Sequence, residues 1–250
     1  MIISKIEDSF YLYTFPPRKD DKFGYNIYAM IDENEALIVD TGFRNHIKLV
    51  EEDLENKNIK IKKVIISHFH LDHILGLKEI NPEKIIGSND YEKTLDVYVD
   101  SEKHHLFTPD IKVDKEMNLK FGHFKLKIQK FPGHAQCSLL ININNKYLHI
   151  GDELMYTNQG EDLLPFVGKS VIKRHIESLE KLKTYKNFII LPSHGKIIKE
   201  EEKIEKDINN RLCYLKAVDS KSEKISYEEA VVECNTEFHH PYWHDQMYKL

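Results

Sequence analysis

Ser67-His-Phe-His-Leu-Asp-His73 places four metal-binding side chains within six residues. Three of them are imidazoles and one is a carboxylate, which are ligands that suit zinc, iron or manganese. The apolar segment 63–67 that precedes them is typical of a short, buried strand. Because α/β folds place their sites in loops that follow strands, this stretch predicts a metal centre within a layered α/β fold. The four ligand candidates are His68, His70, Asp72 and His73.

Three more ligand candidates lie farther along the chain, each directly after a strand-like segment. They are His134, Asp152 and His194. We expect Gly133 to allow an unusual backbone angle just before His134. Two metals about 3.5–4 Å apart that share a carboxylate and a water form a hydrolytic centre. The seven residues together therefore predict an enzyme.

Hydrophobic spacing predicts strands and helices in alternation, which is typical of an α/β layered sheet. The predicted strands are 9–15, 25–31, 36–39, 63–67, 84–87, 124–130, 139–143, 147–150 and 188–191. Predicted helices are 43–57, 73–80, 171–182 and 204–215, and Ser226-Tyr-Glu-Glu229 forms a capping box that opens a last helix. Residues 95–118 are expected to be mostly loop, and 152–168 a loop over the site.

Two segments, 1–118 and 119–200, show a similar order of strands and helices. The predicted organisation is a catalytic domain over 1–200 and a helical tail over 201–250 that packs on the same domain. The chain has 250 residues, of which 41% are hydrophobic, so a sizeable core is expected.

Composition narrows the partners and the location. The net charge of −5 shows no basic excess, so nucleic acid is not the expected partner. The three cysteines are odd in number and form no CxxC pair, which is typical of reduced thiols in the cytoplasm. No apolar run approaches the ~18 residues of a membrane helix. We therefore expect a cytoplasmic protein; its oligomeric state stays open, a homodimer included.

Together with Val39-Asp-Thr-Gly42, the ligand segments resemble the metallo-β-lactamase-fold hydrolases, and they occur in the order of that family. The resemblance covers roughly residues 8–200. It implies an α/β fold that is a four-layer αβ/βα sandwich of two similar halves, with the site at one edge and the helical tail after it. Glyoxalase-like and lactonase-like members are the expected relatives.

The resemblance also implies the metal ligands. It assigns His68, His70 and His134 to the first metal, and Asp72, His73 and His194 to the second. It assigns Asp152 to both metals, as a bridge between them. Asp40 matches a family aspartate that supports the site by orienting ligands. The implied cofactors are two divalent ions, with zinc expected first and iron or manganese as alternatives.

Three departures refine the resemblance. β-Lactamases of the commonest zinc type lack the bridging aspartate and use a cysteine ligand, whereas this chain has Asp152 and no cysteine at a matching place. Flavo-di-iron reductases carry a glutamate where His70 stands, together with a flavodoxin domain that is absent here. The segment 135–138 after His134 differs from the pattern common in the family. These departures point away from antibiotic degradation.

The implied chemistry is hydrolysis of a small ester, thioester or lactone by a hydroxide that bridges the two metals. Asp72 is expected to orient the nucleophile and relay a proton. Tyr156 is a catalytic candidate that could donate to a developing oxyanion; the alternative is a packed loop aromatic. Other functions left open are a phosphodiesterase or nuclease on nucleotides or RNA, a mononuclear iron persulfide dioxygenase, and a metal-binding protein without efficient turnover.

Substrate specificity is expected to come from the loops 16–24 and 153–168 and from the C-terminal tail. The tail segment His239-His-Pro-Tyr-Trp-His244 matches no ligand spacing of the family, so we expect a surface or pocket cap. An apolar wall over the site is predicted from Phe238, Tyr242 and Trp243. Cys137 is expected to be a buried structural thiol.

Overall fold

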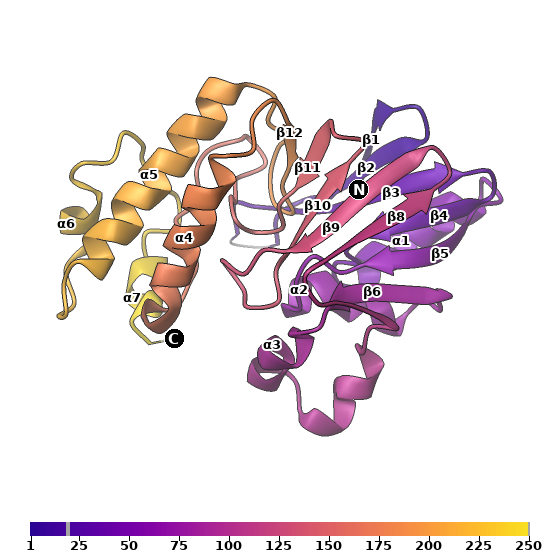
Figure 1. Cartoon of the computed structure of the whole chain (residues 1–250), viewed down its shortest axis with the longest axis horizontal. Coiled ribbons are helices and arrows are strands. Elements are labelled where there is room, and N and C mark those ends of the chain that lie inside the picture. The colour runs from indigo at the N-terminus through magenta and orange to yellow at the C-terminus, as the bar shows by residue number, and fades with distance from the viewer. Residues whose placement is uncertain (19–20, 250) are drawn as a thin grey trace.

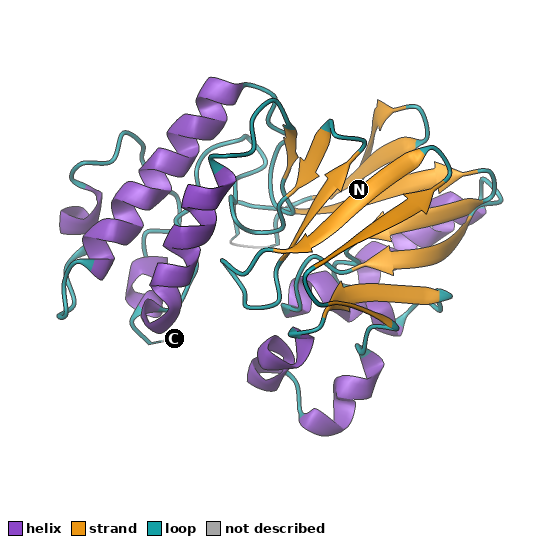
Figure 2. Ribbon diagram, in the orientation of Figure 1, coloured by secondary structure: helices purple, strands orange, loops and turns teal. Residues whose placement is uncertain are grey.

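Two β-sheets lie face to face at the centre of the molecule, and helices gather on both flanks (Figure 1, Figure 2). The computed structural model describes residues 1–18 and 21–249. Within these residues the first sheet has seven strands in sequence order: β1 (Ile2–Glu7), β2 (Phe10–Phe15), β3 (Tyr25–Asp32), β4 (Glu35–Val39), β5 (Lys60–Ile65), β6 (Lys84–Ser88) and β7 (Ile111–Val113). Strands β1–β4 pair antiparallel, and β4–β7 pair parallel.

The second sheet has the strand order β12-β11-β10-β9-β8. Its strands are β8 (Glu116–Phe121), β9 (Phe124–Lys130), β10 (Leu139–Ile143), β11 (Tyr147–His149) and β12 (Ile189–Leu191). Neighbours pair antiparallel except β11 and β12, which are parallel. A parallel pair needs a long crossover connection, and the crossover between β11 and β12 contains a helix.

Helices cover the outer faces of both sheets. The α-helices of the described chain are α1 (Arg44–Glu55), α2 (Leu71–Ile74), α3 (Tyr91–Tyr98), α4 (Ile172–Leu182), α5 (Glu201–Asp219), α6 (Tyr227–Val231) and α7 (Trp243–Met247). Short 3₁₀ turns are η1 (Leu75–Lys78), η2 (Ser101–Leu106) and η3 (Lys169–Val171). Figure 1 shows α4 and α5 side by side, with α6 and α7 nearby, away from α1.

Alternation along the strands explains the layers. In β3, Tyr28 and Met30 point into the apolar cluster between the sheets, while Ile27 and Ala29 point to the helical side. Opposite them, alternate residues of β9 such as Leu126 and Ile128 fill the same central layer. The predicted four-layer αβ/βα sandwich is therefore confirmed.

Two sequence-based predictions about secondary structure were wrong. Strand β1 was missed because it is an edge strand whose residues are mostly exposed, Ile2 by 68%, so no alternation marks it. Residues 95–118 are not mostly loop: they contain the end of α3, the turn η2, strand β7 and part of β8. The two strands, β7 and β8, are short and are defined by pairing with β6 and β9, which sequence periodicity does not report.

The C-terminal segment packs on the rest of the chain through α5. Helix α5 contacts α4, and its residues Ile208 and Leu212 belong to the same apolar cluster as Leu179. The predicted capping box is present at Ser226, whose hydroxyl accepts a hydrogen bond from the Glu229 backbone N–H. The division into a catalytic domain over 1–200 and a tail over 201–250 stays a prediction. In the described part of the chain, no helix is both long and apolar enough to cross a membrane.

Candidate metal centre

The ends of strands from both sheets meet at one edge of the sandwich. Strand β5 leads into the segment 68–73, whose last residues form the start of α2, and β9 leads to His134. Strands β11 and β12 lead to Asp152 and His194 in the same way. The structure thus brings all seven predicted ligand candidates into one cluster.

Four ligand atoms surround a first candidate metal position. His70 Nδ1 lies 3.1 Å from His68 Nε2 and 3.1 Å from His134 Nε2. Asp152 Oδ2 lies 3.6 Å from His68 Nε2 and 3.7 Å from His134 Nε2. Ligands about 2.0–2.1 Å from a tetrahedral zinc ion are separated by about 3.3 Å, so these spacings fit one ion.

Four atoms surround a second position, and Asp152 Oδ2 is common to both. This oxygen lies 3.5 Å from His73 Nε2 and 3.2 Å from His194 Nε2. Asp72 Oδ2 lies 3.6 Å from His73 Nε2 and 3.5 Å from His194 Nε2. One carboxylate oxygen therefore belongs to both sets of candidate ligand atoms, as expected of a carboxylate that would bridge two metals.

The side chains also have the electrostatics of metal ligands. Burial lowers the pKa of His68 and His134 well below the ordinary value, and that of His70 to about 4, so these imidazoles are neutral as ligands must be. The Nε2 atoms of His73 and His194 are buried without a hydrogen-bond partner. Buried nitrogen atoms without a hydrogen-bond partner, next to carboxylates, fit the role of metal ligands.

The two positions differ in charge. Burial alone lowers the pKa of His73, but the carboxylates of Asp72, Asp152 and Asp40 raise it well above 6.5. Burial alone raises the pKa of Asp152, but His194 and His73 hold it well below its ordinary value. The second position thus concentrates negative charge that a divalent cation would neutralise.

Asp40 orients two ligands from behind. Its Oδ2 lies 2.9 Å from His73 Nδ1 and accepts a 2.7 Å hydrogen bond from the Ser67 hydroxyl, and its Oδ1 accepts one of 2.7 Å from the Ser67 backbone N–H. The Ser67 hydroxyl in turn lies 3.1 Å from His68 Nδ1. Asp40 has a φ of 61°, a left-handed conformation that is uncommon outside glycine, asparagine and aspartate. The supporting contact implied by the family resemblance is therefore present.

Two further supports were not predicted from the sequence. The Nδ1 of His194 lies 2.8 Å from the backbone carbonyl of Gly24. The backbone N–H of His134 donates to Glu153 Oε1 over 3.0 Å, and the Ser178 hydroxyl donates to Glu153 Oε2 over 2.6 Å. A carbonyl has no residue signature, and Glu153 is an unremarkable neighbour of Asp152 in sequence, so only the fold reveals them.

The predicted reason for Gly133 was wrong. Gly133 is not among the described glycines with positive φ. A Cβ atom at this position would instead lie 2.2 Å from Glu153 Oε2 and 2.2 Å from Ser178 Oγ. Glycine is needed because the buried carboxylate approaches the backbone closely just before His134.

A pocket of about 240 Å³ opens directly above the cluster. Its floor contains His70, Asp72, His134 and Asp152. Its walls are Phe23, Leu71, Tyr98, Met155, Phe166 and Trp243. Residues of the loops 16–24 and 153–168 and of the C-terminal tail line it, as predicted; Tyr98 and Leu71 were not foreseen.

The predicted aromatic wall from the tail is only partly correct. Trp243 lines the pocket, but Phe238 does not, because it is buried against Tyr214 with ring centroids 6.0 Å apart. Tyr242 is 52% exposed and also lies outside the pocket lining. The tail histidine His240 stacks on Trp243 at 4.7 Å, which agrees with a cap.

Tyr156 does not lie at the reacting centre. Its ring is fully buried between Arg211 and Lys203, 4.9 Å from the guanidinium carbon and 5.2 Å from the Lys203 Nζ. It is not among the residues that line the pocket. Its backbone N–H instead donates to the His194 carbonyl, 3.2 Å away. This position argues against the predicted oxyanion role and favours the alternative, a packed loop aromatic.

Two other features carry no part of the centre. Cys137 is fully buried, as expected, and its thiol lies 3.0 Å from the Thr94 hydroxyl.

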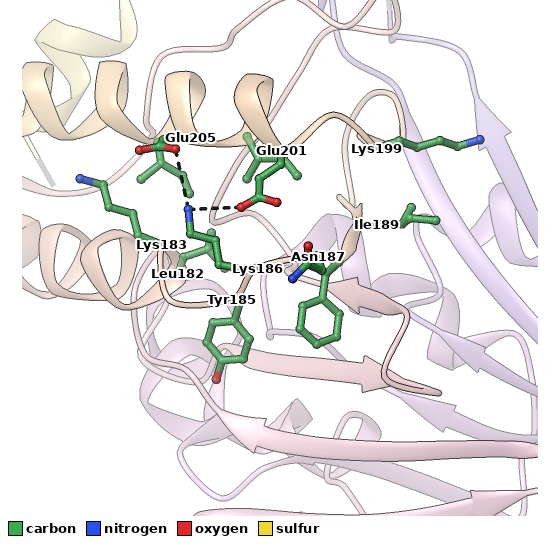
Figure 3. A pocket seen from close by; sticks show the side chains of 12 residues that line it. Leu182, Lys183, Tyr185, Lys186, Asn187, Ile189, Lys199, Glu201 and Glu205 are labelled. Atoms are coloured by element: carbon green, nitrogen blue, oxygen red, sulfur yellow. Dashed lines mark ion pairs between the residues drawn. The ribbon is translucent and has the colours of Figure 1, made fainter.

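A second hollow of about 240 Å³ lies between the end of α4 and the start of α5, where Lys186 pairs with Glu201 and Glu205 (Figure 3). None of the residues that line this hollow is a ligand candidate.

The four-layer sandwich with a His/Asp cluster at its edge defines a class of proteins with a candidate metal centre. A family model described as the metallo-beta-lactamase superfamily matches residues 20–194. The chain belongs to this superfamily.

Curated relatives match the chain at low identity. A hydroxyacylglutathione hydrolase of Francisella philomiragia is 28% identical over 137 residues, which are 53% of this chain and 48% of that protein. A beta-lactamase-like protein 2 homolog of Drosophila melanogaster is 25% identical over 203 residues, 75% of this chain and 64% of that protein. The chain thus spans about half to two thirds of the length of these relatives.

Solved structures share the fold. A metallo-beta-lactamase from Pontibacter korlensis superposes with a TM-score of 0.66 at 16% identity, over 86% of this chain and 98% of that one. A mutant flavo di-iron protein from Thermotoga maritima gives a TM-score of 0.64 at 18% identity, over 86% of this chain and 61% of that one. At these identities the likeness concerns the fold alone.

Proposed function

We propose that this chain is a dinuclear metal hydrolase that cleaves a small ester, thioester or lactone. The observation that carries the proposal is the position of Asp152 Oδ2. This oxygen lies within 3.2–3.7 Å of the Nε2 atoms of four histidines, which are His68, His73, His134 and His194. Such a position suits an oxygen shared by two ions.

The seven clustered side chains would hold the two ions. His68, His70 and His134 would bind the first, Asp72, His73 and His194 the second, and Asp152 both. When bound, the ions supply Lewis acidity and lower the pKa of a coordinated water.

The chain's own groups complete the proposed mechanism. Asp72 lines the pocket with 27% of its side chain exposed, so it can orient the attacking water and accept a proton. Asp40 keeps the His73 ring in place through its contact with Nδ1. The apolar walls around the floor limit the access of other water to the reacting centre.

The alternatives receive less support. Phosphodiester substrates carry charge, but none of the described residues that line the pocket is lysine or arginine. A mononuclear iron dioxygenase would leave the second set of ligands, with its two carboxylates, without a role. A thioester substrate gains support from the Francisella relative, which is named a hydroxyacylglutathione hydrolase.

Metal analysis and a substrate panel test the proposal together. Purified protein loaded with zinc, iron or manganese should bind about two ions per chain and turn over esters, thioesters or lactones. If the fully loaded protein cleaves none of these and no phosphodiester, the hydrolase proposal is wrong and a binding protein remains. One iron per chain with oxygen uptake on glutathione persulfide would establish the dioxygenase instead. Zinc is the proposed native metal, and a small molecule is the proposed partner.

A further inference from the structure

The walls of the metal pocket indicate which substrates it accepts. We propose that the site takes an acyl group that is apolar along its whole length, packed against Trp243, and that it rejects acyl chains ending in a carboxylate. This inference rests on the proposed hydrolase function and adds its substrate class. It assigns to the C-terminal tail the residue that determines specificity.

The walls form a continuous aromatic surface that starts at a ligand. The ring of Phe23 lies 4.9 Å from the ring of His194 and 5.7 Å from Trp243. The ring of Phe166 lies 5.1 Å from Trp243 on another side. Leu71 and Met155 add aliphatic surface. The rest of the acyl chain of a substrate whose carbonyl lies over the metal floor would therefore meet mainly apolar surface.

Charge in the pocket is confined to the floor. The charged or titratable side chains on the floor of the described pocket are the ligand candidates His70, Asp72, His134 and Asp152, and the walls add only the hydroxyl of Tyr98 and the indole N–H of Trp243 as polar groups. Among the residues that the structure describes, no lysine or arginine lines the pocket. A carboxylate at the far end of an acyl chain would lose its hydration against aromatic rings and gain no cation, which is costly. The same argument disfavours the two carboxylates of a glutathione thioester at this wall.

The size of the pocket limits the acyl group. Its volume of about 240 Å³ exceeds the roughly 150 Å³ of an engineered cavity that holds benzene. Scaled from that comparison, the apolar group has roughly six to ten carbon atoms. A hexanoyl or phenylacetyl group is of this size, whereas an acetyl group would leave most of the wall unused.

Contacts with the rest of the chain hold Trp243 in the wall. His240 stacks on its ring at an interplanar angle of 14°, and the His240 Nε2 accepts a hydrogen bond from the Lys22 backbone N–H, 3.4 Å away. His239 pairs through its backbone with Asp162 and Leu164, at 2.9 and 3.1 Å. Trp243 is consequently only 7% exposed although it lies near the end of the chain.

Intrinsic fluorescence provides a binding test that needs no turnover, because Trp243 is the sole tryptophan of the sequence. Hexanoate and adipate, which have equal carbon number and differ at one end, are titrated into zinc-loaded protein. We expect hexanoate to change the fluorescence with a Kd at least about tenfold below that of adipate, because the far carboxylate of adipate would lose its hydration against the apolar wall without gaining a cation. Equal Kd values, or no response to hexanoate, would overturn the inference.

Hydrolysis of matched esters separates this inference from the proposed function. We expect kcat/KM for p-nitrophenyl hexanoate to exceed that for mono-p-nitrophenyl adipate at least about tenfold. In Trp243→Ala the hexanoate value should fall about tenfold or more, and by a larger factor than the value for p-nitrophenyl acetate, whose acyl group reaches less of the wall. The control Val232→Ala lies on the same tail, 79% exposed, and should leave both values unchanged.

Failure of the acyl preference and failure of the proposed hydrolase function would give different results. Turnover of acetate, hexanoate and adipate esters at equal kcat/KM would overturn the acyl preference and leave the hydrolase function standing. Selective binding of hexanoate without turnover of any ester would contradict the hydrolase function and leave the apolar site standing. If Trp243→Ala does not fold, Trp243→Phe tests the same wall, with a smaller expected loss on hexanoate and unchanged zinc content.

Discussion

The floor and the walls of the metal pocket are built in different ways. The floor belongs to the cluster of seven ligand candidates at strand ends, five of which are buried. Within each group of three that could hold one ion, the ligand atoms lie within 4.8 Å of one another. The walls consist of aromatic and aliphatic side chains from loops and from the C-terminal tail, such as Phe23 and Trp243. A metal needs atoms at set distances, whereas an apolar substrate needs only area of the right shape.

This difference teaches where each property of the molecule can change. The floor depends on hydrogen bonds from behind, such as those of Asp40, so a small displacement there affects the ions. The walls depend on how the 152–168 loop and the tail dock on the sheets. Changes in those segments would alter the substrate without altering the reacting centre.

Removal of the proposed bridge should have the largest effect. In Asp152→Ala we expect bound metal to fall from about two ions per chain to one or fewer, and kcat/KM to fall at least about 1,000-fold, because both ions lose a shared ligand. Elemental analysis and ester hydrolysis measure the two effects. Asp8→Ala, whose side chain is 95% exposed, is the control. Two bound ions and full activity in Asp152→Ala would disprove the bridging assignment.

Removal of the buried guanidinium of Arg211, which lies behind the pocket walls, should have the next largest effect, on the free energy of unfolding. Arg211 is 1% exposed and donates to Asp162 Oδ1 over 2.9 Å and to the Met155 carbonyl over 2.7 Å. Arg211→Met leaves Asp162 buried without its cation, so we expect a loss of about 3–5 kcal/mol in the free energy of unfolding. Urea denaturation of the metal-loaded protein measures it.

A matched control lies on the same helix. Lys216 forms an exposed ion pair with Glu180, so Lys216→Met should cost less than about 1 kcal/mol. Equal losses in the Arg211 and Lys216 variants would show that α5 does not stabilise the loop through the buried pair.

Weakening the support behind the floor should have an intermediate effect. Asp40→Asn retains the shape and tolerates the left-handed backbone, but it removes the charge that faces His73 Nδ1. We expect metal affinity to fall about 10–100-fold, measured by competition with a chelator. Ser193→Ala, which removes a longer contact of 3.3 Å to the same carboxylate, should have a smaller effect. Unchanged affinity in Asp40→Asn would contradict the supporting role.

The smallest effect is expected at Tyr156. Because its ring packs against Arg211 and does not line the pocket, Tyr156→Phe should change kcat less than about twofold. Steady-state ester hydrolysis checks this. A loss of about 100-fold or more is typical when an oxyanion donor is removed, and it would restore the catalytic role that the position argues against.

Much of the fold and of the floor was predictable because local patterns report them. Alternation in β9 and helical spacing in α1 depend on neighbouring residues, and the ligand motifs directly follow such strands. Prediction failed where long-range contacts decide the outcome. Strand β1 exists through pairing with β2, and the need for glycine at 133 arises from Glu153 across the loop.

The sequence by itself determined the family, the layered fold and the seven side chains proposed to bind metal, because each depends on residue patterns in short segments with defined spacing. Only the tertiary structure decided how the site is supported and enclosed. It showed Gly24 and Glu153 behind the ligands, Trp243 in the wall and Tyr156 elsewhere. The physical reason is that packing brings together segments far apart in the chain, and no local pattern records which surfaces will meet.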